Sequence, residues 1–334
     1  MITLLFLALG SWSYAETYAP GSALKVTVAK LLPRAEKGDV SAAAALGRAF
    51  AEATPPDDAK AVVWLQRAAD RADVAAQTYL GYMYSKGRGV EQSDAEAFKW
   101  FLRAASENYA PAQVDAAALL LAGRGTPRDE KAAFALCERA VRQKLPAAYA
   151  LMAEMYERGD GVANDDAKAF EFYLRAAEKG IVTAEENVAL MFLHGRGTKL
   201  NVQEAIRWDM RAVEAGSTIA ENNLGFLYEH GADGLPADPA QAVRWYRKAA
   251  DDGLAAAEYN LAMLYRVGFG VARNAGECAR LLALAKNQGY RPPDAPPADN
   301  TTAANRGGAD FSAPASDVDN CFGYFTSFIA SKVP

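Results

Sequence analysis

Residues 194–216 have the sequence HGRGTKLNVQEAIRWDMRAVEAG, and the chain repeats this phrase with small changes. Residues 86–108 are KGRGVEQSDAEAFKWFLRAASEN, and residues 158–180 are RGDGVANDDAKAFEFYLRAAEKG. A repeat period of about 20–50 residues is typical of solenoids and related arrays, in which each copy packs against the next. The repeat therefore decides the fold class.

Each copy of the repeat opens with an alanine. The six clearest copies lie 36 residues apart four times and 37 apart once. They begin at Ala76, Ala112, Ala148, Ala184, Ala220 and Ala257. A degenerate earlier copy starts at Ala42, where TPPDD replaces a glycine-rich turn. These positions predict an N-terminal half-repeat or cap over 16–41 and repeats over 42–290, with bounds at 42–75, 76–111, 112–147, 148–183, 184–219, 220–256 and 257–290.

Positions at fixed distances after the opening alanine form one apolar stripe of a helix. The fifth position after it is small in every copy: Gly47, Gly81, Ala117, Ala153, Ala189, Gly225 and Ala262. The eighth position is large: Phe50, Tyr84, Leu120, Tyr156, Phe192, Tyr228 and Tyr265. We expect the small residue to let a neighbouring helix come close.

A Gly-x-Gly turn follows the first helix in most copies, as at Gly123 and Gly125. Glycine ends helices because it tolerates the left-handed backbone conformation. A second apolar helical stripe follows and ends at a glycine such as Gly180 or Gly216, or at Asn108, the residue type next best suited to that conformation. Each copy is thus predicted to be two helices that bury their apolar faces by stacking on the next copy.

The combined pattern A-x-x-x-L-G-x-x-Y-x-x-G-x-G-V and A-x-x-W-[FY]-x-x-A-A-x-x-G resembles the Sel-one-like repeat family, a branch of the tetratricopeptide-like solenoids. The resemblance covers about residues 35–290 and is clear in AQTYLGYMYSKGRGV and AENNLGFLYEHGADG. It implies an all-α fold, a right-handed superhelical solenoid of about seven antiparallel helix pairs. It also implies a protein-binding role, of the exported bacterial type.

Residues 1–15, MITLLFLALGSWSYA, differ from the repeats. The apolar run from Ile2 to Leu9 and the small residues Ser13 and Ala15 are typical of a secretory signal peptide cleaved before Glu16. The run is shorter than the roughly 20 apolar residues that span a bilayer. The alternative is a buried N-terminal helix, since no Lys or Arg precedes the run. We expect a periplasmic or secreted protein without an integral membrane segment.

Two further segments follow the repeats. Residues 291–316 are rich in Pro, Ala, Gly and Asn, which predicts a flexible or extended linker. Residues 317–334, DVDNCFGYFTSFIASKVP, form an apolar tail in which Phe322, Phe325 and Ile329 could share one face of a short helix. The tail either covers the open face of the last repeat, which we favour because terminal faces of arrays need covering, or lies in the binding groove as an intramolecular ligand.

The composition argues against several classes of function. A net charge of −5 and a pI near 5.3 do not favour a nucleic-acid partner, which requires clustered Lys and Arg. The acidic residues are expected at exposed positions, and no Ser, His and acid arrangement indicates catalysis. His194 and His230 occupy the same position in two consecutive repeats, which we call a column of the repeat. No third ligand lies at the spacing that a metal site requires. We expect no enzymatic activity, no metal and no cofactor.

The chain has three cysteines, Cys137, Cys278 and Cys321. Cys137 and Cys278 lie four repeats apart, whereas a disulfide needs Cα atoms within about 7 Å. Cys278 and Cys321 could form a disulfide, because the linker is long enough to loop back. The alternative is three reduced thiols, two of them buried.

On the first helix, the arc opposite the core carries a second set of columns. In tetratricopeptide-like arrays this face lines the concave groove. The candidate groove residues are Asn187, Leu190, His194, Asn223, Phe226, His230, Asn260 and Met263. Asparagine side chains can pair with a peptide backbone, and the apolar residues can form pockets for anchors. The alternative is that the asparagines are merely soluble surface and the apolar residues pack against the tail.

The sequence therefore predicts a non-catalytic scaffold or adaptor that binds an extended segment of a protein partner. The resemblance implies an envelope role, for example as a periplasmic regulator of exopolysaccharide signalling. One competing function is β-lactamase-like or penicillin-binding activity, linked to relatives with a cysteine pair in nearly every repeat, which this chain lacks. The other is glycan or peptidoglycan binding, which needs a cluster of exposed aromatics, whereas Tyr82, Phe226 and Tyr259 are scattered.

Overall fold

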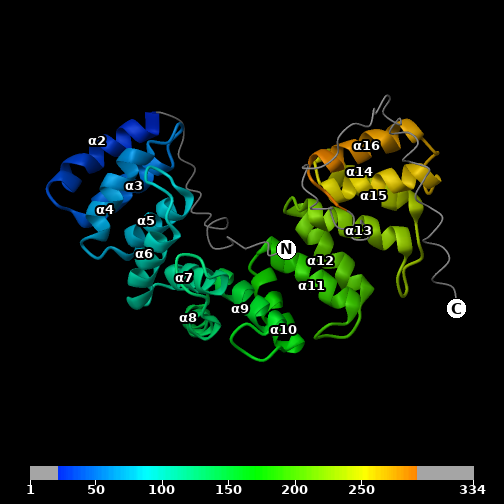
Figure 1. The fold of residues 1–334 in the computed structure, drawn as a ribbon, viewed down its shortest axis with the longest axis horizontal. Coiled ribbons are helices and arrows are strands. Elements are labelled where there is room, and N and C mark those ends of the chain that lie inside the picture. Colours follow the sequence, from blue (N-terminus) through cyan, green and yellow to red (C-terminus); the bar gives the residue numbers. More distant parts are fainter. Residues whose placement is uncertain (1–21, 292–334) are drawn as a thin grey trace, which may run out of the picture. The chain divides into compact units, whose positions relative to one another are not determined.

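The computed structural model describes residues 22–291, so the predicted signal peptide, the tail and nearly all of the linker lie outside the described residues. The described residues form 15 helices, labelled in chain order in Figure 1, and contain no strand beyond one isolated bridge between Ala232 and Leu235. The helices are α2 (Ser22–Glu36), α3 (Val40–Ala51), α4 (Asp58–Ala69), α5 (Val74–Lys86), α6 (Asp94–Ser106), α7 (Ala110–Ala122), α8 (Glu130–Arg142), α9 (Pro146–Arg158), α10 (Asp166–Ala177), α11 (Val182–His194), α12 (Val202–Glu214), α13 (Thr218–His230), α14 (Pro239–Asp251), α15 (Ala255–Val267) and α16 (Ala275–Asn287).

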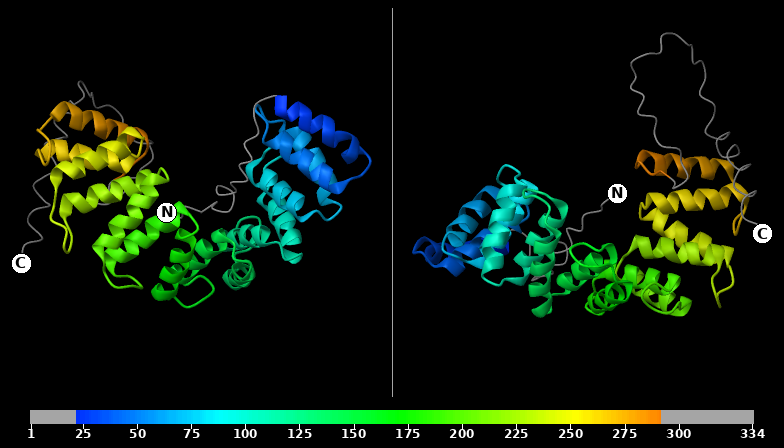
Figure 2. Two further views of the ribbon diagram at one scale, coloured as in Figure 1. Left: turned by 180° about the vertical axis from the view of Figure 1, so that it is seen from behind. Right: turned by 60° about the horizontal axis from the view of Figure 1, so that its bottom comes forward.

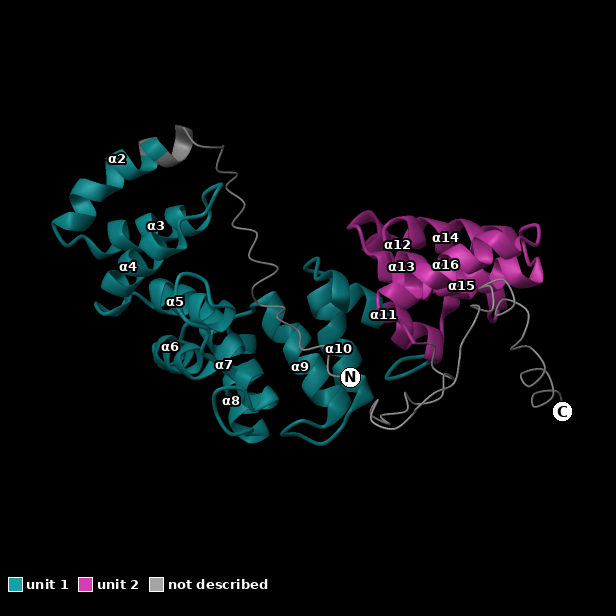
Figure 3. Ribbon diagram, turned by 45° about the horizontal axis from the view of Figure 1, so that its top comes forward, with its two compact units in different colours: residues 1–188, 195–199 teal, residues 189–194, 200–334 magenta. Residues whose placement is uncertain are grey.

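Helices α3 to α16 form seven pairs, each made of the first and the second helix of one repeat; Figure 2 shows them from two further directions. The chain divides into two compact units, coloured separately in Figure 3. Unit 1 contains α2 to α10, and unit 2 contains α12 to α16; α11 contributes residues to both, with Ala189–His194 in unit 2. Within each unit, every helix packs against the next one in the chain. The predicted all-α solenoid of helix pairs is confirmed.

Short polar side chains and left-handed residues set the bounds of the helices. Asp73 caps α5 by accepting a hydrogen bond from the Ala76 backbone N–H at 2.8 Å. Gly123 ends α7 in the left-handed conformation, with φ of +63°. Asn108, predicted to replace a glycine at the end of a second helix, has φ of +60°, which confirms that prediction. Lys144 has φ of +61° at the equivalent position, although its residue type does not indicate this.

The predicted apolar stripes form the core. Leu80 and Met83 on α5 and Leu224 on α13 are fully buried, and Leu227 on α13 is almost fully buried. The small column does what the sequence predicts: a Cβ placed on Gly81 would meet the ring of Phe101 on α6 at 2.7 Å. The absence of a side chain thus lets the two helices of a repeat approach each other.

Candidate binding surface

Contacts at the junctions between repeats position the first helices. The second glycine of each Gly-x-Gly turn lies against the N-terminus of the second helix of the preceding repeat. A Cβ on Gly125 would overlap the backbone carbonyl group of Asp94, and one on Gly197 would overlap that of Asp166. The glycine pair therefore both ends a helix and lets two repeats come into contact. Only the first of these roles could be predicted from the sequence.

The residue between the two glycines forms an ion pair across the same junction. Arg124 binds Asp94 with two hydrogen bonds of 2.8 Å, from Nε to Oδ2 and from Nη2 to Oδ1. Arg88 bridges to Asp58 in the same way, at 2.5 Å between Nη2 and Oδ1. In the fourth repeat the signs are reversed, because Asp160 accepts from Arg128 of the previous repeat at 3.1 Å. Each junction in this series is therefore held by backbone contact and by a charged pair.

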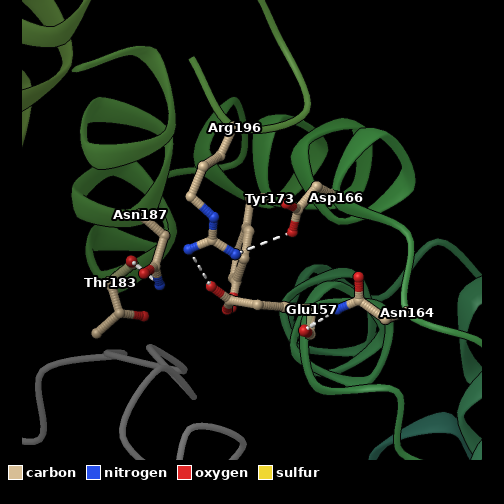
Figure 4. Close-up of polar contacts among 7 residues, drawn as sticks. All are labelled: Glu157, Asn164, Asp166, Tyr173, Thr183, Asn187 and Arg196. Atoms are coloured by element: carbon tan, nitrogen blue, oxygen red, sulfur yellow. Dashed lines mark hydrogen bonds and ion pairs between the residues drawn. The ribbon is translucent and has the colours of Figure 1, made fainter. Parts of the chain in front are cut away.

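Figure 4 shows the junction between the fourth and fifth repeats, which lies in unit 1. The guanidinium group of Arg196 points between two carboxylates, with Nη1 3.0 Å from Glu157 Oε1 and Nη2 2.9 Å from Asp166 Oδ1. The hydroxyl of Tyr173 donates to the other oxygen of Glu157 at 2.8 Å. Burial raises the pKa of this tyrosine, and the adjacent Glu154 and Glu157 carboxylates raise it further, so the phenol stays protonated and acts as a donor.

We expect Arg124→Met to lower the free energy of unfolding by about 1 kcal/mol, because it breaks a bidentate, three-quarters buried pair while keeping the aliphatic stem. The matched control is Arg207→Met, which removes the more exposed pair with Glu204 at 3.4 Å and should have no measurable effect. Thermal unfolding followed by circular dichroism checks both variants. Equal losses in the two would show that the junction pair has no special role.

Acidic side chains are not all exposed, contrary to the sequence-based expectation. The buried ones are Asp115, Glu154, Glu185, Asp209, Glu221 and Glu258. Glu221 on α13 forms an ion pair with Lys248 at 2.9 Å, and Glu258 on α15 accepts a hydrogen bond from Gln288 at 3.0 Å. Gln113 takes the equivalent place in α7 and donates to the carbonyl oxygen of Ala105 at 3.4 Å. The column that contains Gln113, Glu221 and Glu258 therefore links first helices to the ends of second helices. The residues of this column have a structural role.

Two carboxyl groups of unit 1 have strongly shifted pKa values. Asp115 on α7 is 7% exposed, and burial raises its pKa to about 7. Glu154 on α9 is also buried, which raises its pKa to about 7, although Arg158, 3.7 Å away, acts in the opposite direction. Both groups lie in the columns of the first helix that the sequence analysis assigned to the groove, but at positions it did not select.

In unit 2, the first helices present a row of partly exposed side chains that we call the strip. It consists of Leu190 and His194 on α11, Ile219, Asn223, Phe226 and His230 on α13, and Asn260, Met263 and Val267 on α15. Phe226 is 48% exposed and Leu190 is 38% exposed, while Met263 is half-buried. Asn187, the remaining predicted groove residue, belongs to unit 1.

The strip contains one large apolar residue, Ile219, outside the columns predicted from the sequence. Ile219 is 48% exposed and precedes Phe226 by seven residues, which is two helical turns, so both side chains lie on the same face of α13. Val267, 44% exposed, lies near the end of α15. The helical spacing from Phe226 was a signal that could have identified Ile219.

The predicted asparagines already use their amide nitrogens inside the chain. Asn187 donates to the backbone carbonyl of Thr183 at 2.9 Å, Asn223 to Asp209 at 3.4 Å, and Asn260 to the side chain of Asn222 at 2.9 Å. The last of these bonds joins α15 to α13 along the strip. The amide groups are thereby fixed in orientation, and each keeps its carbonyl oxygen as an acceptor and a second N–H as a donor.

The two histidines of the strip are exposed. The ring of His230 stacks on that of Phe226, with centroids 4.2 Å apart, and its Nδ1 lies 3.1 Å from the Phe226 carbonyl oxygen. Together they form one aromatic surface on α13. Among residues 22–291, no group of three or more His, Cys, Asp or Glu side chains is placed to hold a metal ion.

The two described cysteines, Cys137 and Cys278, are buried and do not contribute to this surface. Cys137 is a buried thiol whose Sγ lies 3.4 Å from the Ala148 carbonyl oxygen, and burial raises its pKa. Cys278 is fully buried in α16. Cys321 lies outside the described residues, so its disulfide with Cys278 stays a prediction. In the described part of the chain, no helix combines the length and apolar character that crossing a bilayer requires.

The stacked helix pairs, the junction contacts and the exposed strip define a helical repeat protein of the kind that binds other proteins. The Sel1 repeat model matches residues 40–73, 74–109, 110–145, 146–181, 182–217, 218–254 and 255–290. The chain belongs to the Sel1 repeat family, as the sequence resemblance implied. Sel1 repeats generally mediate protein–protein interactions, and the family generally consists of non-catalytic interaction scaffolds.

Solved structures support the same assignment. The chain is 30% identical to c5321, a protective antigen of uropathogenic Escherichia coli strains with an SLR fold, with a TM-score of 0.66. That match covers 80% of this chain and 58% of the E. coli protein, so the chain spans less than two thirds of that relative. It is also 30% identical to a Sel1 repeat protein from Oxalobacter formigenes, with a TM-score of 0.62, over 82% of this chain and 80% of the other. No curated protein matches the chain.

Proposed function

We propose that this protein is a non-catalytic scaffold that holds an extended segment of a partner protein on the strip of unit 2. The observation that supports this most is the exposure of Phe226 and Ile219 on α13 and of Val267 on α15. These are large apolar side chains on helices whose opposite faces already form a complete core, because Leu224 and Leu264 are buried. Exposed apolar groups that gather on one face are typical of interaction sites.

The chemistry of the strip suits an extended peptide with apolar anchors. Phe226 stacked on His230 offers a flat aromatic surface, and buried aromatic anchors dominate the energetics of many interfaces. Asn223 and Asn260 are held by internal hydrogen bonds, and their amide oxygens can accept backbone N–H groups of a partner. Apolar contacts would supply most of the affinity, and the amides would fix the direction of the segment.

The proposed location is the bacterial envelope, in the periplasm or outside the cell. The signal-peptide pattern of residues 1–15 supports export, and both solved relatives described above are bacterial proteins. A partner in this location would be an envelope or secreted protein, for example one that controls exopolysaccharide signalling. Fractionation of source cells should place the chain, cleaved before Glu16, in the envelope; uncleaved protein in the cytosol would contradict this location.

Affinity capture from the envelope fraction of source cells tests the function. The bait is the chain from Glu16 to Pro334, compared with a Leu190→Glu, Phe226→Glu double variant. A matched control, Met210→Glu with Leu284→Glu, places the same charges at similarly exposed positions on the second helices α12 and α16. We expect a protein that the native chain and the control retain and the strip variant loses. The proposed binding surface is wrong if all three chains retain the same proteins.

A further inference from the structure

The strip and the tail are both apolar and belong to one chain. Residues 317–334 include Phe322, Phe325 and Ile329 at helical spacing. Residues at this spacing share one face when a segment is helical, and an amphipathic helix binds by laying its apolar face on a hydrophobic surface. The described residues offer two places for it: the strip on the first helices, and the face of the seventh repeat that no further repeat covers.

The seventh repeat already suits exposure to water. One column of the second helix is apolar in the first six repeats: Val62, Phe98, Phe134, Phe170, Ile206 and Val243. The seventh repeat has the small Ala279 there. A second column consists of Ala69, Ala105, Val141, Ala177, Val213 and Ala250, and the seventh repeat has the exposed Lys286.

The packing of this column shows what the change removes. Val62 packs against the core cluster that contains Leu80 and Met83 of the following first helix, and Val243 is buried in the cluster that contains Leu261. Ala279 and Lys286 lie seven residues apart, on one face of α16. Replacing a large apolar residue by alanine and an alanine by lysine makes this face polar enough to stay uncovered. The seventh repeat therefore caps the array itself, and the tail is not needed to cover its outer face.

The strip has the opposite character. It exposes the large apolar residues Ile219, Phe226 and Val267, whereas the face of the seventh repeat carries Ala279 and Lys286. The 25 residues 292–316 between the described repeats and the tail span a root-mean-square distance of about 25–30 Å as a flexible chain, and about 80 Å when extended. Either length allows residues 317–334 to reach the surface of unit 2, to which the linker is attached. Tethering at such lengths gives an effective concentration on the order of millimolar, so a weak contact is sufficient.

We propose that residues 317–334 dock on the strip of unit 2 through Phe322, Phe325 and Ile329 and compete with the partner for that surface. The proposal rests on the proposed function only for the competition; the docking itself requires only the strip and the tail. A partner segment must then displace the tail, so the strip is covered when no partner is present. This inference departs from the expectation that the tail covers the last repeat.

Intramolecular photo-crosslinking of the purified chain from Glu16 to Pro334 tests the docking. Benzoylphenylalanine replaces Phe226 in one preparation and Lys286, on the face of the seventh repeat, in the other. We expect crosslinked peptides that join position 226 to residues 317–334, at a yield independent of protein concentration. Substituting Phe322→Ser and Phe325→Ser should abolish them. Crosslinks to the tail from position 286 instead, or from neither position, overturn the proposal.

The purified chain contains no partner, so this result does not depend on the proposed function. Capture from source cells with the Phe322→Ser, Phe325→Ser chain then tests the competition, and we expect it to retain more partner than the native chain does. If position 226 crosslinks to the tail but capture is unchanged, the docking stands and the competition is wrong. The Phe322→Ser and Phe325→Ser substitutions alter residues 317–334 only and leave the sequence of the repeats unchanged.

Discussion

We expect Gly125→Ala to destabilise the protein by about 3 kcal/mol, whereas Gly216→Ala should cost only about 1 kcal/mol. Both glycines have positive φ, +68° and +88°, so both variants include the strain of a left-handed alanine. Only Gly125 also lies against a backbone, that of Asp94, while a Cβ on Gly216 would have nothing within 4 Å. The difference between the two variants therefore measures the contact between repeats.

Thermal unfolding followed by circular dichroism checks this pair of variants. The stability of a repeat array includes a contribution from each interface between neighbours, so Gly125→Ala should weaken the coupling across the junction that joins Asp94 to Gly125. We expect a lower midpoint and a broader or divided transition for Gly125→Ala, and a modest uniform shift for Gly216→Ala. Equal shifts would show that the second glycine is only a helix stop.

The second large effect concerns pH. We expect Asp115→Asn to raise the free energy of unfolding at pH 8 by on the order of 2 kcal/mol and to leave it nearly unchanged at pH 4. Burial raises the pKa of Asp115 to about 7 in the folded chain, above the value near 3.9 of an unfolded aspartate. Between these values the folded state keeps a proton that the unfolded state has lost. Stability therefore falls as the pH rises from about 4 to about 7, and the asparagine removes this loss.

Thermal unfolding at pH 4 and pH 8 measures the effect, with Asp233→Asn, at an exposed turn position, as the control. Glu154 should preserve part of the pH dependence in the Asp115→Asn variant, because its pKa is also raised to about 7 by burial. The assignment fails if Asp115→Asn and Asp233→Asn respond to pH in the same way.

The repeating fold could be predicted from the sequence because each column repeats the same local physics. The left-handed Asn108 and the close helix contact at Gly81 follow from residue type at fixed spacing, and both are confirmed. The contact of Gly125 with Asp94 could not be predicted, because it depends on how one repeat is placed on the previous one. The same applies to the ion pair of Arg124, which looks like an ordinary surface arginine in the sequence.

The candidate surface was only partly accessible to sequence reasoning. The columns identified Phe226 and Leu190, and the structure shows both exposed. The sequence could not show that the amide of Asn223 donates to Asp209, because these residues lie on consecutive helices whose contact depends on packing. Asp115 was missed because Tyr79 and Leu151 hold the same column in neighbouring repeats, so no pattern marks a buried acid there.

Photo-crosslinking in living source cells tests the central claim, that a partner protein binds the strip of unit 2. Benzoylphenylalanine replaces Phe226 on the first helix α13 in one strain and Met210 on the second helix α12 in another. Our account predicts a higher-mass adduct with one defined protein from position 226 and none from position 210. An adduct from position 210 alone, with none from position 226, would contradict the account and place binding on the second helices.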